Sequence, residues 1–441
     1  MIYLRNHRGF TLVESLVGSA IFVAIALSGY KAFAVLMDGV AVSQAKIAGT
    51  SVANEQFEIM RNLPYTDVGI VSGLPLGKIE RTKTITKDKY IFNVETAIRS
   101  IDDVFDGTIG GSPSDTSPAD YKLADLDITC TNCKTPLALN FTTLVAPHAL
   151  ETASTNGALF IRVFDSAGVA VPGASLHIVN TQTEPDTIID EITDNNGWFR
   201  IVDAPVGTNA YTITATKAGF TQENTYAPGG AAGPTPINPN PTVVLQQVTS
   251  TSLTIDRTST LNVSTVDSSC VTLPSIGFSL TGTKLIGTPS VLKYPTNTFS
   301  TDLLGQLSIG SLEWDSYSTL LTSGAYDLAG TSLLPSFTLD ANEIKNLQLV
   351  AVPHIDRALL ISVQDSLGNP IDGATVELQK TGFNQNKTTG GGACATAGQA
   401  FWNSLSSGFY TLTVSKAGYQ DNVSSPQISA PWQAVTVTLV P

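Results

Sequence analysis

The sequence predicts a multidomain chain: one long N-terminal α-helix with a small α+β body, followed by three tandem all-β sandwich modules. Three observations predict this fold class. An apolar run over residues 10–30 contains a single charged residue, Glu14. Beyond residue 65, short β-branched segments alternate with turns rich in the chain's 36 Gly and 23 Pro. The pattern of residues 158–168 recurs at 358–368. A chain of 441 residues is also too long for one domain.

The first element is a helix over residues 10–62, whose first part, 10–36, is apolar enough to span a membrane. About 20 apolar residues cross the hydrocarbon core of a bilayer. The preceding segment, residues 1–9, carries Arg5 and Arg8. Positive charge beside an apolar span stays on the cytoplasmic side. We therefore expect a single membrane pass with the N-terminus inside.

The second half of this helix should be amphipathic. Apolar residues recur at helical spacing from Phe33 to Met60, with polar residues between them. Pro64 ends the helix because proline lacks an amide donor and disfavours helical backbone in the residue before it. Small residues that allow close helix approach lie within it: Gly18, Gly29, Gly39 and Gly49.

Three simpler explanations of the apolar run compete: a secretory signal peptide, a plain membrane anchor and a buried core helix. The run is longer than the apolar core of a signal peptide, and no good cleavage site follows it. A plain anchor leaves Glu14 unexplained, because a carboxylate inside a bilayer costs about 2.5–3.5 kcal/mol on insertion scales.

Residues 9–14 read Gly-Phe-Thr-Leu-Val-Glu, which resembles the leader and cleavage motif of type IV prepilins. The resemblance covers the leader and the first helical turns. It implies that a membrane prepilin peptidase cuts between Gly9 and Phe10 and methylates the new amine of Phe10. It also implies that Glu14 neutralises that amine on a neighbouring subunit. The implied partners are other pilin subunits, packed helix to helix, and the inner membrane before assembly.

Residues 63–150 are predicted to form a small pilin-like β body. Segments 78–85 and 90–98 are rich in β-branched residues and should form a hairpin. A third strand at 123–128 follows the Gly-, Ser- and Pro-rich loop 107–118. In pilin-like proteins, a short sheet of this kind packs on the outer half of the long helix.

The remaining chain is predicted to form three sandwiches, at 151–248, 249–352 and 353–441. The two outer modules resemble the carboxypeptidase regulatory-like domain, a transthyretin-like sandwich whose members are non-catalytic spacers or binding modules. The middle module is degenerate, because it lacks the Asp-Ser-x-Gly turn of the outer two.

Residues 243–245 look like the last strand of the first module. The Pro- and Gly-rich segment 228–241 is then a long loop of that module, with a linker between modules as the alternative.

Composition and motifs predict neither catalysis nor a cofactor. The chain has 37 acidic and 24 basic residues and a net charge of −13, which disfavours nucleic acid as a partner. No nucleophile motif and no His-Glu-x-x-His occur, and the four His are far apart, so no metal site is predicted. Asp102, Asp103 and Asp106 form an acidic turn, interpreted as a solvated loop, with a calcium site as the alternative.

The four cysteines are too few for a disulfide scaffold. Cys130 and Cys133 are interpreted as a local disulfide of an exported domain, with free thiols as the alternative. Cys270 and Cys394 are expected as lone buried cysteines, with a bridge between them as the lesser alternative.

The leading hypothesis is a type IV pilin-like filament subunit, a minor or tip component because its body is so large. It would reside in the cell membrane and then in an extracellular filament, where the modules contact an unknown surface or carbohydrate ligand. The alternatives are a pseudopilin of a secretion or DNA-uptake machine and a membrane-anchored surface protein that never polymerises. Trp198 and Trp402 lie in equivalent strands, which favours core packing over sugar binding for both.

Overall fold

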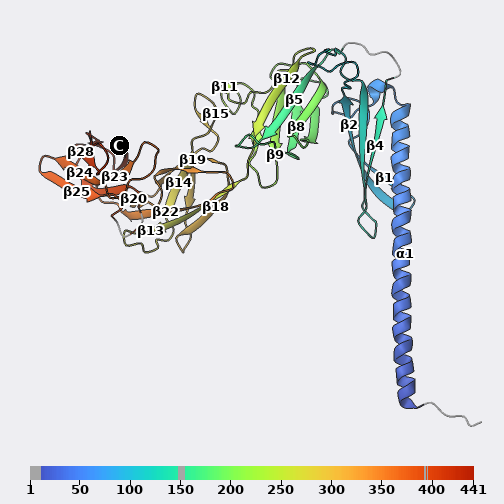
Figure 1. The fold of residues 1–441 in the computed structure, drawn as a ribbon, viewed down its shortest axis with the longest axis horizontal. Helices are drawn as coiled ribbons and strands as arrows, with labels where there is room; N and C mark the ends of the chain where they lie inside the picture. Colours follow the sequence, from blue (N-terminus) through green and yellow to red (C-terminus); the bar gives the residue numbers. More distant parts are fainter. Residues whose placement is uncertain (1–10, 148–153, 392–393, 395) are drawn as a thin grey trace, which may run out of the picture.

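The computed structural model describes residues 11–147, 154–391, 394 and 396–441. One long helix is followed by many strands in several sheets, as the sequence predicts. In Figure 1, a small sheet lies beside the upper end of the helix, and the sandwiches lead away from that end one after another.

The helix α1 (Leu12–Asn62) begins at Thr11 and ends at Leu63, directly before Pro64. These limits agree with the predicted helix. Its apolar stripe is buried only in the C-terminal part, at Ala45, Ala48, Gly49, Val52, Ala53, Phe57 and Met60. A Cβ on Gly49 would lie 2.7 Å from Leu139 Cδ1, so a larger residue here would force the Leu139 side chain to move.

The body is one antiparallel sheet in the order β1-β2-β3-β4, packed on this part of α1. The predicted hairpin and third strand are present, but the first strand begins at Thr82 rather than at residue 78. The fourth strand was not predicted, because its mixture of Thr, Asn and apolar residues gives a weak pattern. The elements are η1 (Tyr65–Asp67), β1 (Thr82–Lys87), β2 (Tyr90–Ile101), β3 (Tyr121–Cys130) and β4 (Ala138–Val145).

The first module has two sheets, ordered β12-β5-β8 and β10-β9-β6-β7. Its strands are β5 (Gly157–Phe164), β6 (Ser175–Asn180), β7 (Thr187–Ile192), β8 (Trp198–Ala204), β9 (Tyr211–Thr216), β10 (Glu223–Asn224) and β12 (Val248–Thr254). Its last strand is β12, which pairs in parallel with β5. The predicted last strand at 243–245 and the module end at 248 are therefore wrong. Val243 forms only an isolated bridge with Gly207, whereas β12 is mostly Ser and Thr and gives little apolar signal.

The second module has sheets ordered β18-β13-β22-β20 and β17-β14-β19-β21. The segment 228–241 supplies β11 (Thr235–Pro236), which pairs with β15 of this module rather than remaining a loop of the first. The strands are β13 (Ser259–Val266), β14 (Gly277–Gly282), β15 (Leu285–Thr288), β16 (Val291–Leu292), β17 (Asn297–Ser300), β18 (Gln306–Leu312), β19 (Asp315–Leu321), β20 (Tyr326–Thr331), β21 (Ser336–Leu339) and β22 (Ile344–Pro353).

The third module repeats the topology of the first, with sheets ordered β26-β23-β31 and β25-β24-β28-β29 and a small pair, β27-β30. In all three modules the first strand pairs in parallel with the last long strand: β5 with β12, β13 with β22 and β23 with β31. Its strands are β23 (Arg357–Gln364), β24 (Thr375–Lys380), β25 (Phe383–Thr388), β26 (Gln399–Leu405), β27 (Gly408–Phe409), β28 (Thr411–Ser415), β29 (Asn422–Ser424), β30 (Gln427–Ile428) and β31 (Trp432–Thr438).

The middle module does contain the turn that the sequence analysis found missing. Asp267 accepts from the amide of Cys270 at 3.1 Å and donates to the carbonyl of Val271 at 2.8 Å. Cys270 has φ 63°, where Gly168 and Gly368 of the outer modules have φ 80° and 84°. The turn was missed because a cysteine stands in the place of the expected glycine.

The same cysteine joins two modules. Cys270 forms a disulfide with Cys394 of the third module, so the expectation of two lone cysteines is wrong. The pairing follows from the turn, which brings Cys270 toward the third module, whereas the sequence separates the two residues by 124 positions.

Hydrogen bonds reinforce this junction. The Gln399 carbonyl oxygen accepts from the Thr331 amide at 2.8 Å, and its amide nitrogen donates to the Leu333 carbonyl at 3.0 Å. The indole of Trp432 donates to the Leu328 carbonyl at 2.9 Å. Side chains of the third module thus satisfy backbone groups within β20 and just beyond its end.

We predict that Gln399→Ala destabilises the junction between the second and third modules. The substitution leaves the buried Thr331 amide without its acceptor, at a cost of about 1–3 kcal/mol. Denaturant unfolding of the full chain measures the effect, with Gln385→Ala on exposed strand β25 as the control. Equal stability of the two variants would contradict the role assigned to Gln399.

Candidate functional site

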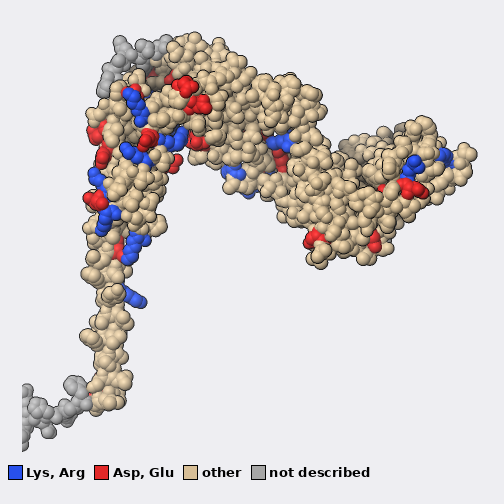
Figure 2. Space-filling view, turned by 180° about the vertical axis from the view of Figure 1, so that it is seen from behind, with Lys and Arg blue, Asp and Glu red and all other residues tan. Residues whose placement is uncertain are grey.

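The N-terminal half of α1 is bare. Every residue from Thr11 to Phe33 is exposed, and the most apolar stretch of the helix has no buried residue. The helix is long and apolar enough to cross a membrane. The visible face of the lower stem in Figure 2 carries almost no charged side chains, whereas charges gather where the body begins. A helix that is apolar all round requires an apolar environment.

Glu14 lies at the exposed end of this helix and forms a capping box with Thr11. The Glu14 amide donates to Thr11 Oγ1 at 3.2 Å, and the Thr11 amide donates to Glu14 Oε2 at 3.0 Å. This capping role was not predicted, although Thr-x-x-Glu before an apolar run is a recognised capping signal. Gly9 and Phe10, the predicted cleavage residues, lie outside the described residues.

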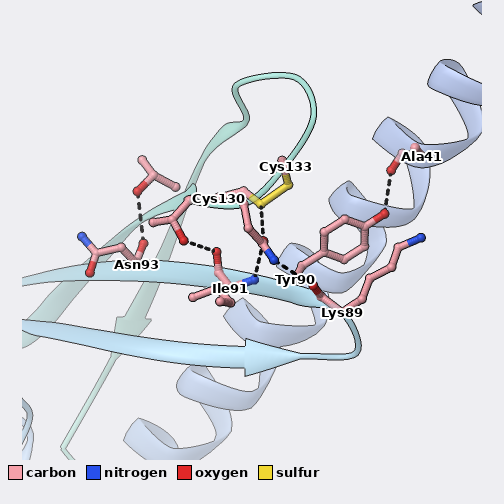
Figure 3. Close-up of a disulfide and its surroundings, with 10 residues drawn as sticks. Ala41, Lys89, Tyr90, Ile91, Asn93, Cys130 and Cys133 are labelled. Atoms are coloured by element: carbon pink, nitrogen blue, oxygen red, sulfur yellow. Dashed lines mark hydrogen bonds between the residues drawn. A yellow bond between two sulfur atoms is a disulfide. The ribbon is translucent and has the colours of Figure 1, made fainter.

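The body is fixed to the middle of α1 by a hairpin tip and a disulfide loop (Figure 3). Cys130 and Cys133 form a disulfide that closes this loop. Within it, the Asn132 side chain accepts from the Ile91 amide at 2.8 Å and donates to the Lys89 carbonyl at 2.9 Å. The disulfide therefore holds Asn132 where it can bind the tip of the β1–β2 hairpin.

Helix and loop meet around a cavity of about 250 Å³. The Tyr90 hydroxyl donates to the Ala41 carbonyl at 3.1 Å, and the Lys134 ammonium forms an ion pair with Asp38. The cavity wall is mixed, with Leu137 among the apolar residues. This junction marks the point on α1 where protein contacts begin, and the bare segment lies entirely on its N-terminal side.

A buried lysine fixes the other end of the body. Lys122 Nζ donates to the carbonyls of Tyr65 and Val68 at 2.7 and 2.6 Å, which holds the turn that follows α1. Burial lowers the pKa of Lys122 to about 8. Lys122 was not predicted as a site residue, although it occupies an inward position of β3, in line with Ala124 and Leu126.

The acidic turn is partly buried rather than fully solvated. Burial is the main cause that raises the pKa of Asp102 to about 6. The hydrogen bond from the Ile109 amide opposes this shift, and the nearby carboxylates of Asp115, Asp120 and Asp106 contribute to it. Within the described residues, no group of three or more Asp, Glu, His or Cys side chains is arranged to hold a metal ion.

Trp198 and Trp402 lie in equivalent strands, as predicted, but at different positions in them. The prediction of core packing is confirmed for Trp402 and is wrong for Trp198. Arg162 is paired with Trp198 and Leu359 with Trp402, and the two strands are offset within their modules. Trp402 faces the core and is 1% exposed, whereas Trp198 lies half-buried on the outer face of its sheet.

No protein-family model and no curated protein matches the chain. Among solved structures, it is similar to the Bacillus anthracis TIE protein, at 14% identity and TM-score 0.20, covering 82% of this chain and 74% of that one. The match to a Streptococcal ancillary pilin has 12% identity and a TM-score of 0.18, and it covers 65% of this chain and 98% of that one. The match to BcpA, the major pilin subunit of Bacillus cereus, has 11% identity and a TM-score of 0.17, and it covers 65% of this chain and 99% of that one. TM-scores this low carry no conclusion about the function of this chain.

We predict that the carboxyl group of Asp102 makes the body less stable as pH rises. Its folded pKa, about 6, exceeds its ordinary value of 3.8, so its favourable contribution is complete below about pH 4 and is lost as pH rises through 6. Asp102→Asn should therefore melt at a higher temperature than wild type at pH 7.5, and the difference should shrink toward pH 4.

Calorimetry of the full chain measures this difference at each pH. Asp106→Asn removes the same charge from an exposed position of the same loop and serves as the control. A difference between wild type and Asp102→Asn that stays constant with pH, or that Asp106→Asn reproduces, would contradict the prediction.

Proposed function

We propose that the chain is a subunit of a type IV pilin-like filament and acts as a minor or tip component through assembly rather than catalysis. The observation that carries the proposal is the bare apolar half of α1, which directly follows the Gly-Phe-Thr-Leu-Val-Glu motif of residues 9–14. In a filament, copies of such helices from neighbouring subunits cover one another and remove this surface from water.

Processing is the first step of the proposal. A prepilin peptidase in the inner membrane removes residues 1–9 and methylates Phe10. The subunit then waits as a single-pass membrane protein with its N-terminus inside. Its apolar helix is later extracted into the filament with those of other pilins. The body and the modules stay on the outer side throughout.

Glu14 has a defined task in this mechanism. On assembly its carboxylate gives up or keeps its hydrogen bonds with Thr11, and it pairs with the free amine of Phe10 on an adjacent subunit. Opposite charges attract strongly in a medium of low dielectric constant, and an unpaired charge there is costly. The pairing therefore sets the axial position of each subunit.

The size of the projecting arm supports a minor or tip position. Three sandwiches extend from the end of the body (Figure 1), and a dense helical array of such subunits would crowd them. At a tip, the modules are free to contact a surface or carbohydrate ligand. A pseudopilin of a secretion or DNA-uptake machine shares the same motif and differs in the machine it joins.

The competing function is a membrane-anchored surface protein that does not polymerise. One observation favours it: the capping box with Thr11 gives Glu14 a local role that needs no neighbouring subunit. Two observations distinguish these functions. One is whether the N-terminus is cleaved, and the other is whether assembly needs the charge of Glu14 or only its capping hydrogen bonds.

We expect the mature protein to begin with N-methylated Phe10. Mass spectrometry of protein purified from membranes measures the N-terminal residue, and Gly9→Ala should leave the leader in place. An intact Met1 in the wild-type protein, or cleavage beyond Tyr30, would remove the pilin-like proposal and favour the anchor or a signal peptide.

We also expect Glu14→Gln to be processed normally but to reach filaments at least tenfold less than wild type. Glutamine keeps the capping geometry and removes the charge. Thr11→Ala is the matched control, because it breaks the capping box and keeps the carboxylate. Quantifying each variant in sheared filaments measures the effect. Strong loss with Thr11→Ala and none with Glu14→Gln would show that Glu14 acts as a cap alone.

A further inference from the structure

The outer face of the sheet β12-β5-β8 in the first module carries two arginines and two aromatic rings. Arg162 lies opposite Trp198, and Phe160 lies opposite Arg200, on adjacent antiparallel strands. We call these four residues the arginine–aromatic face. Their alternating neighbours on β5 point into the core, which places all four on the solvent side of the sheet.

The four side chains form one connected cluster. The guanidinium carbon of Arg200 lies 5.2 Å from the ring centroid of Trp198 and 5.7 Å from that of Phe160. That of Arg162 lies 5.6 Å from the Trp198 ring. Guanidinium groups at such distances are attracted to aromatic rings while their N–H groups remain able to bind an anion.

In the third module, the corresponding face of the sheet packs against the second module. The residues at the same positions are Leu360, Ser362, Gln399 and Phe401. Leu360 is 0% exposed and packs in the core of the second module, and Gln399 is 2% exposed and binds its backbone. This face of the third module is thus a docking surface.

In the first module this face stays open to solvent. The body contacts the first module through Leu74 against the core and through the Arg81 side chain against the Ile188 carbonyl. Strand β2 of the body also meets the edge strand β8, where Arg200 lines a small cavity together with Arg99. Arg162 and Arg200 remain exposed, and the side chain of Arg200 is 49% accessible. The surface that is docked in one module is available for a partner in the other.

Charge indicates the partner. The chain has a net charge of −13, yet two guanidinium groups flank one indole here. Among the described residues, Arg200 forms an ion pair with Asp194, whose carboxylate lies 3.6 Å away, too far for a strong hydrogen bond. Planar guanidinium groups bind carboxylates through two parallel hydrogen bonds. The half-buried indole adds a flat apolar surface between them.

We propose that the arginine–aromatic face binds an acidic polysaccharide. Carboxylates of the sugar chain pair with Arg162 and Arg200, and the apolar side of a sugar ring lies against Trp198. This binding proposal deepens the proposed function. It rests on that function for one premise, the position of the first module outside the cell. The net negative charge of the chain repels any polyanion, and it disfavours nucleic acid most because the phosphates there are densely spaced. An acidic peptide offers carboxylates but no sugar ring for the indole.

The test uses the full chain in detergent micelles and polygalacturonate as the probe. Wild type should bind polygalacturonate and should not bind neutral dextran. Its affinity for polygalacturonate should fall as the salt concentration increases. Trp198→Ala and the double variant Arg162→Gln/Arg200→Gln should each lose at least tenfold in affinity. Arg61→Gln changes the charge of an exposed arginine on α1 and should bind like wild type. Unchanged melting temperatures establish that the variants are folded.

Several results would overturn the proposal. These are absence of binding, equal loss with Arg61→Gln, full binding by Trp198→Ala, or equally tight binding of polyglutamate or DNA through the same residues. The result is independent of assembly. If the chain binds polygalacturonate but is not cleaved after Gly9, the filament proposal is refuted and the binding proposal stands. If the chain assembles normally but does not bind, the binding proposal is refuted and the filament proposal stands.

Discussion

An apolar helix surface without protein cover is the constraint on which the rest of this structure depends. From Thr11 to Phe33 the helix has no neighbour among the described residues that could shield it. The hydrophobic effect therefore requires a bilayer or other helices around it. The contacts of the body follow from this requirement, because they begin only at Asp38 and Ala41, on the C-terminal side of the bare segment.

The modules are joined by specific contacts rather than by free linkers. Between the first and second modules, Lys293 pairs with Glu223 at 2.6 Å and with Glu313 at 2.8 Å, and all three side chains are largely buried. Strand β11 adds a backbone connection, and a disulfide and Gln399 secure the next junction. Removing one partner of a buried pair is costly, so the arm should keep a defined shape.

Periodicity predicted the elements that are long and regular. The stripe from Phe33 to Met60 and the stop at Pro64 gave the helix its observed limits, and β-branched runs gave the hairpin of the body. The errors came from elements whose signal lies in tertiary structure. Strand β12 is Ser- and Thr-rich and is defined by its parallel partner, and Cys270 replaces a glycine because it bonds to another module. The site was predictable only in its motif, since the local partner of Glu14 and the outward position of Trp198 depend on capping geometry and strand register.

The parallel pairing of first and last strands has a mechanical consequence. The chain enters each sandwich at one end of the sheet and leaves at the other, so a pull on the distal module draws β12 and β5 in opposite directions along their shared axis. The register joins residues 248–254 to 158–164 along their whole length, and all of these hydrogen bonds then bear the load together instead of opening one by one. We therefore expect this pairing to resist a pull along the arm better than a pairing that opens from one end.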